Sequence, residues 1–165
     1  MLRMMPSVRQ LSDDMQETVK KMLQLSAHFK FAQFIQGENI GQSIQMLQER
    51  IRDDRQEPFK LYLFASICIM SGLTGKVSLK GSGFLTERNA FIVLLATKSL
   101  MQLETADPLR AYWSYIASRA SMMHLTYGLP EELTFARLLC LTRTSDVTGV
   151  EVLQAAWRQL TQRQR

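Results

Sequence analysis

Glycine, lysine and serine concentrate between Gly72 and Gly83, and these residue types are the ones that bind nucleotide phosphates in a P-loop. That loop has the sequence G-x-x-x-x-G-K-[ST], in which backbone amides and the lysine hold the phosphates. Here only two residues separate Gly72 from Gly75, and Val77 follows Lys76 where a hydroxyl residue is required. We therefore expect a plain connecting loop and no nucleotide site.

Histidines and carboxylates, which supply metal ligands and transfer protons, are few or unsuitably spaced. The two histidines, His28 and His124, belong to no H-E-x-x-H sequence and no cysteine–histidine cluster. The acidic pairs at 13–14 and 131–132 stand at expected helix starts, where negative charge stabilises the helix without any catalysis. We expect no enzyme, no catalytic residue, no metal site, no cofactor and no small-molecule substrate.

Six basic residues are candidates for contact with phosphate groups on a membrane or a nucleic acid. The net charge of +5 is a modest excess that favours anionic partners. The candidates lie on an early helix or around the glycine-rich stretch, and they are Lys20, Lys21, Lys76, Lys80, Arg88 and Lys98. Scattered, solvated charges are an equally good interpretation, and no aromatic residues are interleaved as in single-strand binding.

The composition is that of a globular protein kept in a reducing compartment. Of the 165 residues, 46% are apolar and 21% charged, which supports one domain or two small subdomains. Cys68 and Cys140 stand among apolar residues, so we expect small buried thiols and no disulfide. The longest apolar run, Leu61–Met70, is shorter than the ~20 residues of a spanning helix, and residues 1–10 lack the apolar segment of a signal peptide.

The hydrophobic pattern predicts helices throughout the chain. Ile40, Ile44, Leu47 and Ile51 form an amphipathic stripe. Helix starts are expected at Ser12, Thr86 and Asp107, which have capping side chains, with Pro108 at a favourable first helical position, and Gly37 is expected to end a helix. The segment Leu61–Leu73 is apolar on all sides, which predicts a central helix buried on most of its surface.

The later helices complete an all-α, multi-helix bundle of two packed helical subdomains. The helix after Thr86 has a broad apolar surface formed by Phe91, Leu94, Leu95, Leu100 and Leu103. Further helices are expected from 108 to near 128, from 130 to about 142, and from 147 to 162. We divide the chain into an N-terminal subdomain at 1–75, a glycine-rich linker at 76–86 and a second subdomain at 87–165.

One segment, residues 112–146, resembles the matrix proteins of orthomyxoviruses, the influenza-like viruses. In both, a Ser-Tyr pair leads into a helix of small residues, and a turn is followed by a helix with an acid, Phe-Ala, Leu and Cys. The matching positions are Ser114, Tyr115, Ala120, Ser121, Met122, Leu125, Tyr127, Glu132, Phe135, Ala136, Leu138 and Cys140. The resemblance is to the N-terminal domain of such proteins and favours a divergent member.

Two departures limit what this resemblance carries over. The influenza proteins have a dense basic run on a middle helix, whereas residues 89–102 here contain Lys98 as their one basic residue. Those proteins also have a second cysteine followed by histidines, where this chain has Arg143 and no histidine after it. The basic-helix role and a zinc site are therefore not expected.

What the resemblance implies is a structural protein of the virion that lies beneath the envelope. Such a protein binds anionic lipid peripherally, self-associates into a shell and contacts ribonucleoprotein or RNA; in the host it is found in the cytoplasm, at membranes and in the nucleus. Two alternatives remain open from the residues alone. One is a helical adaptor whose apolar groove takes a partner helix, as in apoptosis-regulator-like bundles. The other is a basic nucleic-acid-binding module.

Overall fold

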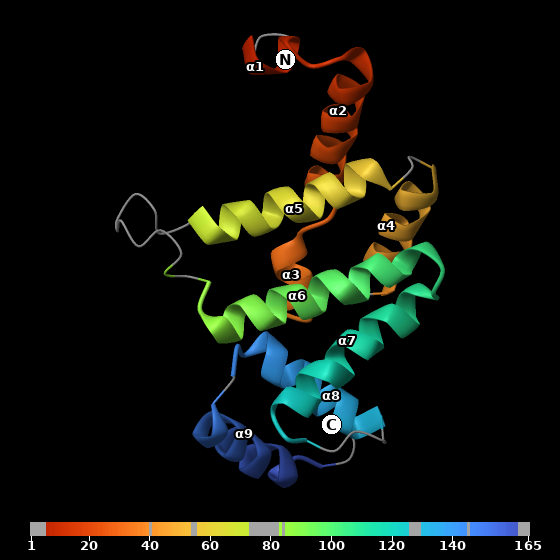
Figure 1. Ribbon diagram of the computed structural model, residues 1–165. Coiled ribbons are helices and arrows are strands. Elements are labelled where there is room, and N and C mark those ends of the chain that lie inside the picture. Colours follow the sequence, from red (N-terminus) through yellow and green to blue (C-terminus); the bar gives the residue numbers. More distant parts are fainter. Residues whose placement is uncertain are drawn as a thin grey trace. The chain divides into compact units, whose positions relative to one another are not determined.

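The computed structural model describes residues 6–39, 41–53, 56–72, 83, 85–125, 130–144 and 146–161. Within these residues the regular secondary structure is nine α-helices and one 3-10 turn, without a strand (Figure 1). The expected all-α, multi-helix fold is therefore confirmed.

The chain divides into two compact units, and neither is continuous in sequence. The first comprises residues 1–31 and 42–90, and the second comprises residues 32–41 and 91–165. The units separate after residue 90, within helix α6 (Glu87–Met101). Most of the predicted linker at 76–86 lies outside the described residues, so its role stays a prediction.

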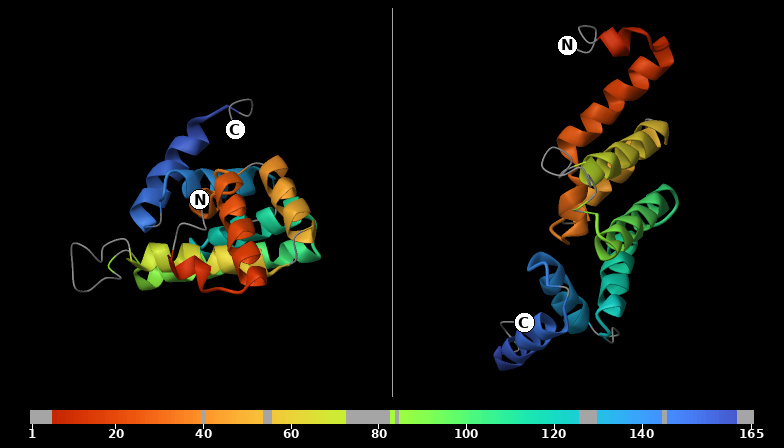
Figure 2. Two further views of the ribbon diagram at one scale, coloured as in Figure 1. Left: turned by 90° about the horizontal axis from the view of Figure 1, so that it is seen from above. Right: turned by 60° about the vertical axis from the view of Figure 1, so that its left-hand side comes forward.

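The first unit is built on the packing of two long helices. It contains α1 (Pro6–Arg9), α2 (Asp13–His28), most of α4 (Gly41–Asp53) and α5 (Glu57–Gly72). The hydroxyl of Ser12 accepts a hydrogen bond from the Met15 amide at 3.4 Å, so the predicted cap of α2 is confirmed. Helix α2 packs against α5, as Figures 1 and 2 show.

Tyr62 of α5 joins these helices at the end of α2. Its hydroxyl donates to the carbonyl of Phe29 at 2.7 Å and accepts from the amide of Phe31 at 2.9 Å. The rings of Phe29 and Tyr62 also meet edge to face, with centroids 6.3 Å apart. Burial raises the pKa of Tyr62, and the bond from Phe31 opposes that rise. The neutral phenol therefore forms a hydrogen bond with each of the two backbone groups.

The apolar stripe predicted for α4 is confirmed where the structure describes it. Ile44, Leu47 and Ile51 are all buried, whereas Ile40 lies outside the described residues. These three residues recur at helical spacing, so one face of α4 is apolar and buried while the other carries its charges.

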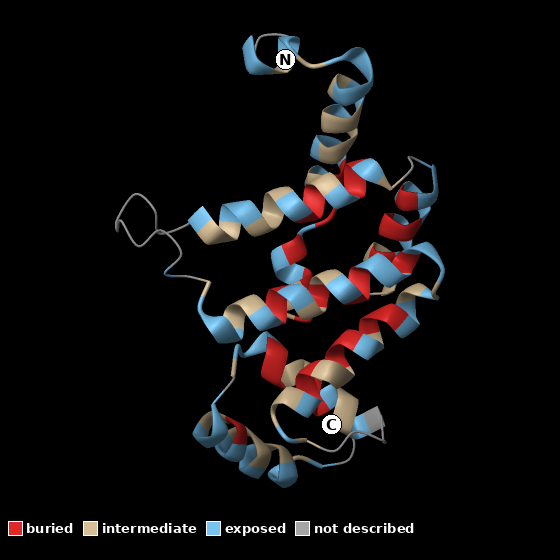
Figure 3. Cartoon of the chain, in the orientation of Figure 1, coloured by how far each residue is buried: buried red, intermediate tan, exposed pale blue. Residues whose placement is uncertain are grey.

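The buried residues of helix α5 all lie in its first half, and the rest of the helix is half-buried or exposed. Phe59, Tyr62 and Leu63 are buried, but Phe64 is 65% and Ile69 66% exposed (Figure 3). The expectation that Leu61–Leu73 is buried on most sides is therefore wrong over its described part. Cys68, expected to be buried, is exposed as well. The packing on α2 covers one stripe of α5 and leaves other sides in solvent.

The second unit contains the remaining helices. They are α3 (Phe31–Ile35, from Ala32 onward), α6 from Phe91, η2 (Gln102–Glu104), α7 (Pro108–Met122), α8 (Pro130–Leu141) and α9 (Val147–Gln159). Helix α7 packs on α8, and α8 packs on α9 (Figure 2). Ala111 and Ala120 of α7 and Ala136 of α8 are buried, so small side chains are available where these helices pack closely.

The helix starts predicted at Thr86, for α6, and at Asp107, for α7, are confirmed. Thr86 accepts a hydrogen bond from the Asn89 amide at 3.3 Å, and Asp107 accepts from the Arg110 amide at 3.0 Å. Helix α9 has a comparable cap that the sequence did not suggest to us. There, the carboxylate of Asp146 accepts from the Gly149 amide at 2.8 Å.

Candidate functional site

Four of the six basic residues proposed from the sequence are placed on two helices. Lys20 and Lys21 lie on α2, where Lys20 is exposed and pairs with Glu17 at 3.1 Å. Arg88 and Lys98 lie on α6, and both are exposed. Lys76 and Lys80 lie outside the described residues. A single patch made of all six therefore stays a prediction.

A row of exposed side chains runs along α6, and it contains one of these cations. We call this row the outer face of α6, and it consists of Glu87, Phe91, Leu94, Lys98 and Met101. Its members follow one another at intervals of four, three, four and three residues, so they lie on one side of the helix. Phe91 is 54% exposed, Leu94 62% and Met101 37%.

The opposite side of α6 is buried, which makes this helix apolar on two sides. Its buried members are Ile92, Val93, Ala96, Ser99 and Leu100. The sequence predicted one broad apolar surface for the whole helix. The structure divides it: Leu100 and Leu103 are fully buried, while Phe91 and Leu94 point into solvent. The sequence pattern could not predict this division, because the same apolar residue types occur on the exposed side and on the buried side of the helix.

A second feature is the turn after α3, residues Ile35–Gly37, which α7 and α8 hold in place. Tyr115 donates to the carbonyl of Ile35 at 2.6 Å, and Tyr112 donates to the carbonyl of Gly37 at 2.8 Å. Gly37 has a φ of +68°, in the left-handed region that favours glycine. The prediction that Gly37 ends a helix is thus confirmed.

Three arginines contact the same turn. Arg119 donates to the Ile35 carbonyl at 3.3 Å, and Arg137 donates to the Gly37 carbonyl at 3.0 Å. Arg143 donates to the side-chain carbonyl of Gln36 at 3.0 Å. Cations are favoured at the carbonyl end of a helix, so these contacts satisfy polar groups where α3 stops. The sequence gives no signal of this cluster, because each arginine is 84 or more residues away from its partner in the turn.

Burial and the arginines act in opposite directions on the acidic protons of this region. Burial raises the pKa of Tyr112, and the nearby positive charge of Arg137 opposes that rise. Burial likewise raises the pKa values of Tyr115 and Cys140, with Arg119 opposing both shifts. Burial is the larger effect in each case, so the phenols and the thiol remain protonated. Neutral, buried groups of this kind serve structure rather than nucleophilic chemistry.

The sequence matches, over residues 1–165, the profile of a family described as a family of unknown function (DUF6829). The chain belongs to this family. No curated protein and no solved structure matches it. Membership in DUF6829 names no activity.

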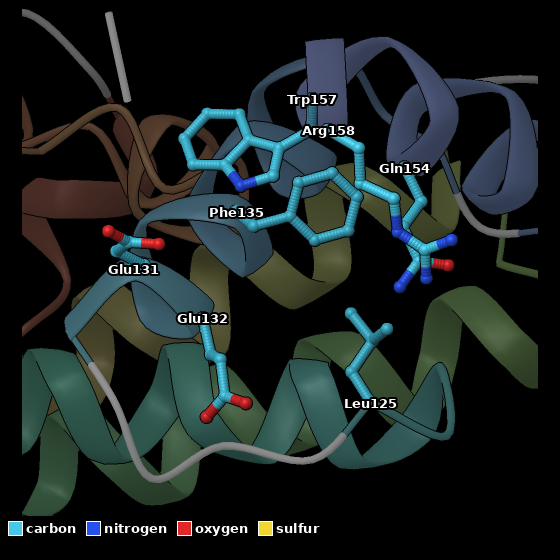
Figure 4. Close-up of a pocket in the computed structure, with 7 residues that line it drawn as sticks. All are labelled: Leu125, Glu131, Glu132, Phe135, Gln154, Trp157 and Arg158. Carbon is cyan, nitrogen blue, oxygen red and sulfur yellow. The ribbon is translucent and has the colours of Figure 1, made fainter. Parts of the chain in front are cut away.

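This DUF6829 chain also has a small pocket beside α8 and α9, with a volume of ≈ 150 Å³. Phe135 and Trp157, whose ring centroids are 5.6 Å apart, form its apolar wall (Figure 4). The complete lining is Leu125, Glu131, Glu132, Phe135, Gln154, Trp157 and Arg158. Pockets for drug-sized ligands start at about 300 Å³, so this one is of a size for a single side chain.

Two further properties concern metals and membranes. The described residues contain no group of three or more histidine, cysteine, aspartate or glutamate side chains able to hold a metal ion. Among the described helices, none combines the length and the apolar character needed to cross a bilayer.

Proposed function

We propose that this chain is a non-enzymatic helical domain that works by binding and assembling, and that the outer face of α6 is its contact surface. The observation that supports this proposal is the line of exposed Phe91, Leu94 and Met101. Large apolar side chains that gather on a surface mark sites of interaction. Burying such a side chain completely contributes about 1.5–3 kcal/mol, so a partner that covers this line gains stability.

The spacing along this face favours a helical partner. Its alternating intervals of four and three residues average 3.5, which is the period of a coiled-coil seam. Such a seam inserts its side chains between those of a facing helix. An extended peptide would instead require an exposed sheet edge, and the described residues form no strand.

The test compares the wild-type chain with a variant carrying Phe91→Ser and Leu94→Ser, using sedimentation velocity over a wide range of concentration. We expect the wild type to associate and the variant to remain monomeric with an unchanged circular dichroism spectrum. Val152→Ser is the matched control, because Val152 is 64% exposed but lies on α9. A wild type that stays monomeric throughout would overturn the proposal.

A second candidate function is peripheral binding to an anionic membrane. It is favoured by Lys98, which lies among Phe91, Leu94 and Met101, and by Arg88, which is exposed on the same helix. Helix faces that combine apolar side chains with cations lie in the headgroup region of anionic bilayers. Each such cation contributes about 1 kcal/mol near the surface, so one protomer binds weakly and an assembly binds by avidity.

Co-sedimentation with vesicles tests this second function. We expect binding to phosphatidylserine-rich vesicles, loss of binding in high salt, and none with neutral vesicles. Lys98→Glu should reduce binding, whereas Lys60→Glu, an exposed lysine on α5, is the matched control. The shell beneath a viral envelope that the resemblance implies would combine assembly with membrane binding, and ribonucleoprotein contact would be a third activity. Binding equal for neutral and anionic vesicles would contradict this candidate.

A further inference from the structure

We infer that the partner of α6 is the α6 of a second copy of this chain, packed antiparallel across a two-fold axis. This inference rests on the proposed function, because it uses the outer face of α6, and it goes further by naming the occupant and its orientation. The observation that carries it is the order of chemical types along the face. Reading forward, the first four of its five members are an acid, an aromatic residue, an aliphatic residue and a base.

The spacing of these four residues is the same in both directions. Glu87, Phe91, Leu94 and Lys98 are separated by four, three and four residues. When a second copy runs the opposite way, Phe91 of one chain therefore faces Leu94 of the other. In the same register, Glu87 of each chain faces Lys98 of the other. A two-fold axis between residues 92 and 93 produces both pairs twice.

The charges distinguish this arrangement from a parallel one. In a parallel pair in the same register, Glu87 would face a second Glu87 and Lys98 a second Lys98. Like charges across a helix seam are unfavourable, whereas charge pairs select partner and orientation. The antiparallel arrangement places an acid opposite a base at both ends and keeps the apolar pair in the middle. It is also closed, because the same patch is used on both subunits.

The length of α6 sets the strength of the contact. Its 15 residues extend for about 22 Å, so the seam is short. Stable interfaces usually bury about 1,200–2,000 Å² in total, which exceeds what one short helix pair provides. A weak, reversible dimer is therefore expected, with contacts elsewhere on the chain free to extend the assembly.

The first experiment exchanges the charges and measures the dimer dissociation constant by sedimentation equilibrium. Glu87→Lys and Lys98→Glu should each raise the constant by roughly tenfold, because each single change places like charges together at both ends of the seam. The double variant restores opposite charges and should return to the wild-type constant. Glu151→Lys, an exposed acid on α9, is the matched control and should leave the constant unchanged.

The second experiment determines orientation by disulfide formation in chains that carry Cys68→Ser. A chain with Glu87→Cys is mixed with a chain carrying Lys98→Cys, and each is also oxidised alone. A disulfide needs Cβ atoms about 4 Å apart, so the mixed pair should cross-link and the single chains should not. Cys140 is buried and stays outside this reaction.

The outcomes separate this inference from the proposed function. Antiparallel pairing would be overturned if the Glu87→Cys chain or the Lys98→Cys chain formed a cross-linked dimer when oxidised alone. It would also be overturned if the double charge exchange did not restore the wild-type dissociation constant. Association that is still abolished by Phe91→Ser with Leu94→Ser would then leave the outer face of α6 as a self-association surface used in another arrangement. A wild type that never associates would overturn both.

Discussion

Tyr115 and Arg119, one turn apart on α7, share a single acceptor, the carbonyl oxygen of Ile35. The hydroxyl of Tyr115 donates to it at 2.6 Å and the guanidinium of Arg119 at 3.3 Å. Arg119 also donates to the Tyr115 hydroxyl at 3.0 Å, which closes the arrangement. Both side chains are buried, so the end of α3 depends on this triangle for its hydrogen bonds.

Removing the Tyr115 hydroxyl should destabilise the chain. Tyr115→Phe keeps the ring and its packing but leaves the Ile35 carbonyl with the longer bond from Arg119. We expect the free energy of unfolding to fall by about 1–2 kcal/mol, measured by urea denaturation. Ser114→Ala is the control, because Ser114 is exposed on the same helix. An equal loss in both variants would show that the triangle contributes nothing.

Alkaline pH should unfold the chain through its buried phenols. Burial raises the pKa values of Tyr62, Tyr112 and Tyr115, and unfolding returns them to about 10. As pH rises through 10, the unfolded chain releases protons that the folded chain retains, so the free energy of unfolding decreases. It should begin to fall slightly above about pH 8, because the unfolded thiol of Cys140 releases its proton at about 8.5 while the buried thiol retains it, and it should fall more steeply above about pH 10. Denaturation curves at successive pH values measure this, and a rise above pH 10 would contradict it.

Gly37 should not tolerate a side chain. Gly37→Ala places a Cβ 3.3 Å from Cys140 and 3.3 Å from Ile116, at a φ of +68°. We expect a loss of about 1–3 kcal/mol in the free energy of unfolding. Gly72→Ala is the matched control, because a Cβ there meets nothing within 4 Å at the end of α5. It should be neutral or slightly stabilising, and a loss at Gly72 as large as at Gly37 would remove the argument from φ.

The two thiols should differ in reactivity. Cys68 is exposed, whereas Cys140 is buried and has a raised pKa. Because the thiolate is the reactive form, a disulfide reagent should modify Cys68 rapidly and Cys140 on unfolding. Counting the cysteine thiols that the reagent modifies before and after urea is added checks this. Modification of both at one rate in the native chain would contradict the placement of Cys140.

Neighbouring residues on α5 should respond oppositely to truncation. Leu63 is 3% exposed and Phe64 is 65% exposed. Leu63→Ala should lower the free energy of unfolding by about 2–5 kcal/mol because it leaves a cavity. Phe64→Ala removes more carbon but should change it by less than about 1 kcal/mol. Thermal or urea unfolding decides the matter, and similar losses would mean that Phe64 is covered in solution.

Local features of this fold could be predicted from the sequence because their causes are local. Ser12, Thr86 and Asp107 cap helices through bonds to amides three residues away, and the stripe of α4 follows from the helical period. The burial of Cys140 was also predicted correctly. Each of these needs only the order of nearby residues.

Features that depend on distant residues could not be predicted. The apolar run of α5 has the same composition whether a partner covers it or not, so Phe64 and Cys68 were expected to be buried. The turn at Gly37 is held by Tyr112 and Arg137, and their side chains carry no signal of that contact in the sequence. The outer face of α6 was visible as apolar residues, but its exposure depends on which elements pack against the opposite side.

The hydrogen bonds at the turn after α3 also constrain how the chain folds. Gly37 bonds to residues 75 and 100 positions later, and Gln36 bonds to one 107 positions later. Contacts between such distant positions require long loops to close, which slows folding. During synthesis, the segment 32–41 must wait until most of the chain has left the ribosome. We therefore expect the second unit to acquire its native core late, after α2 and α5 have already paired.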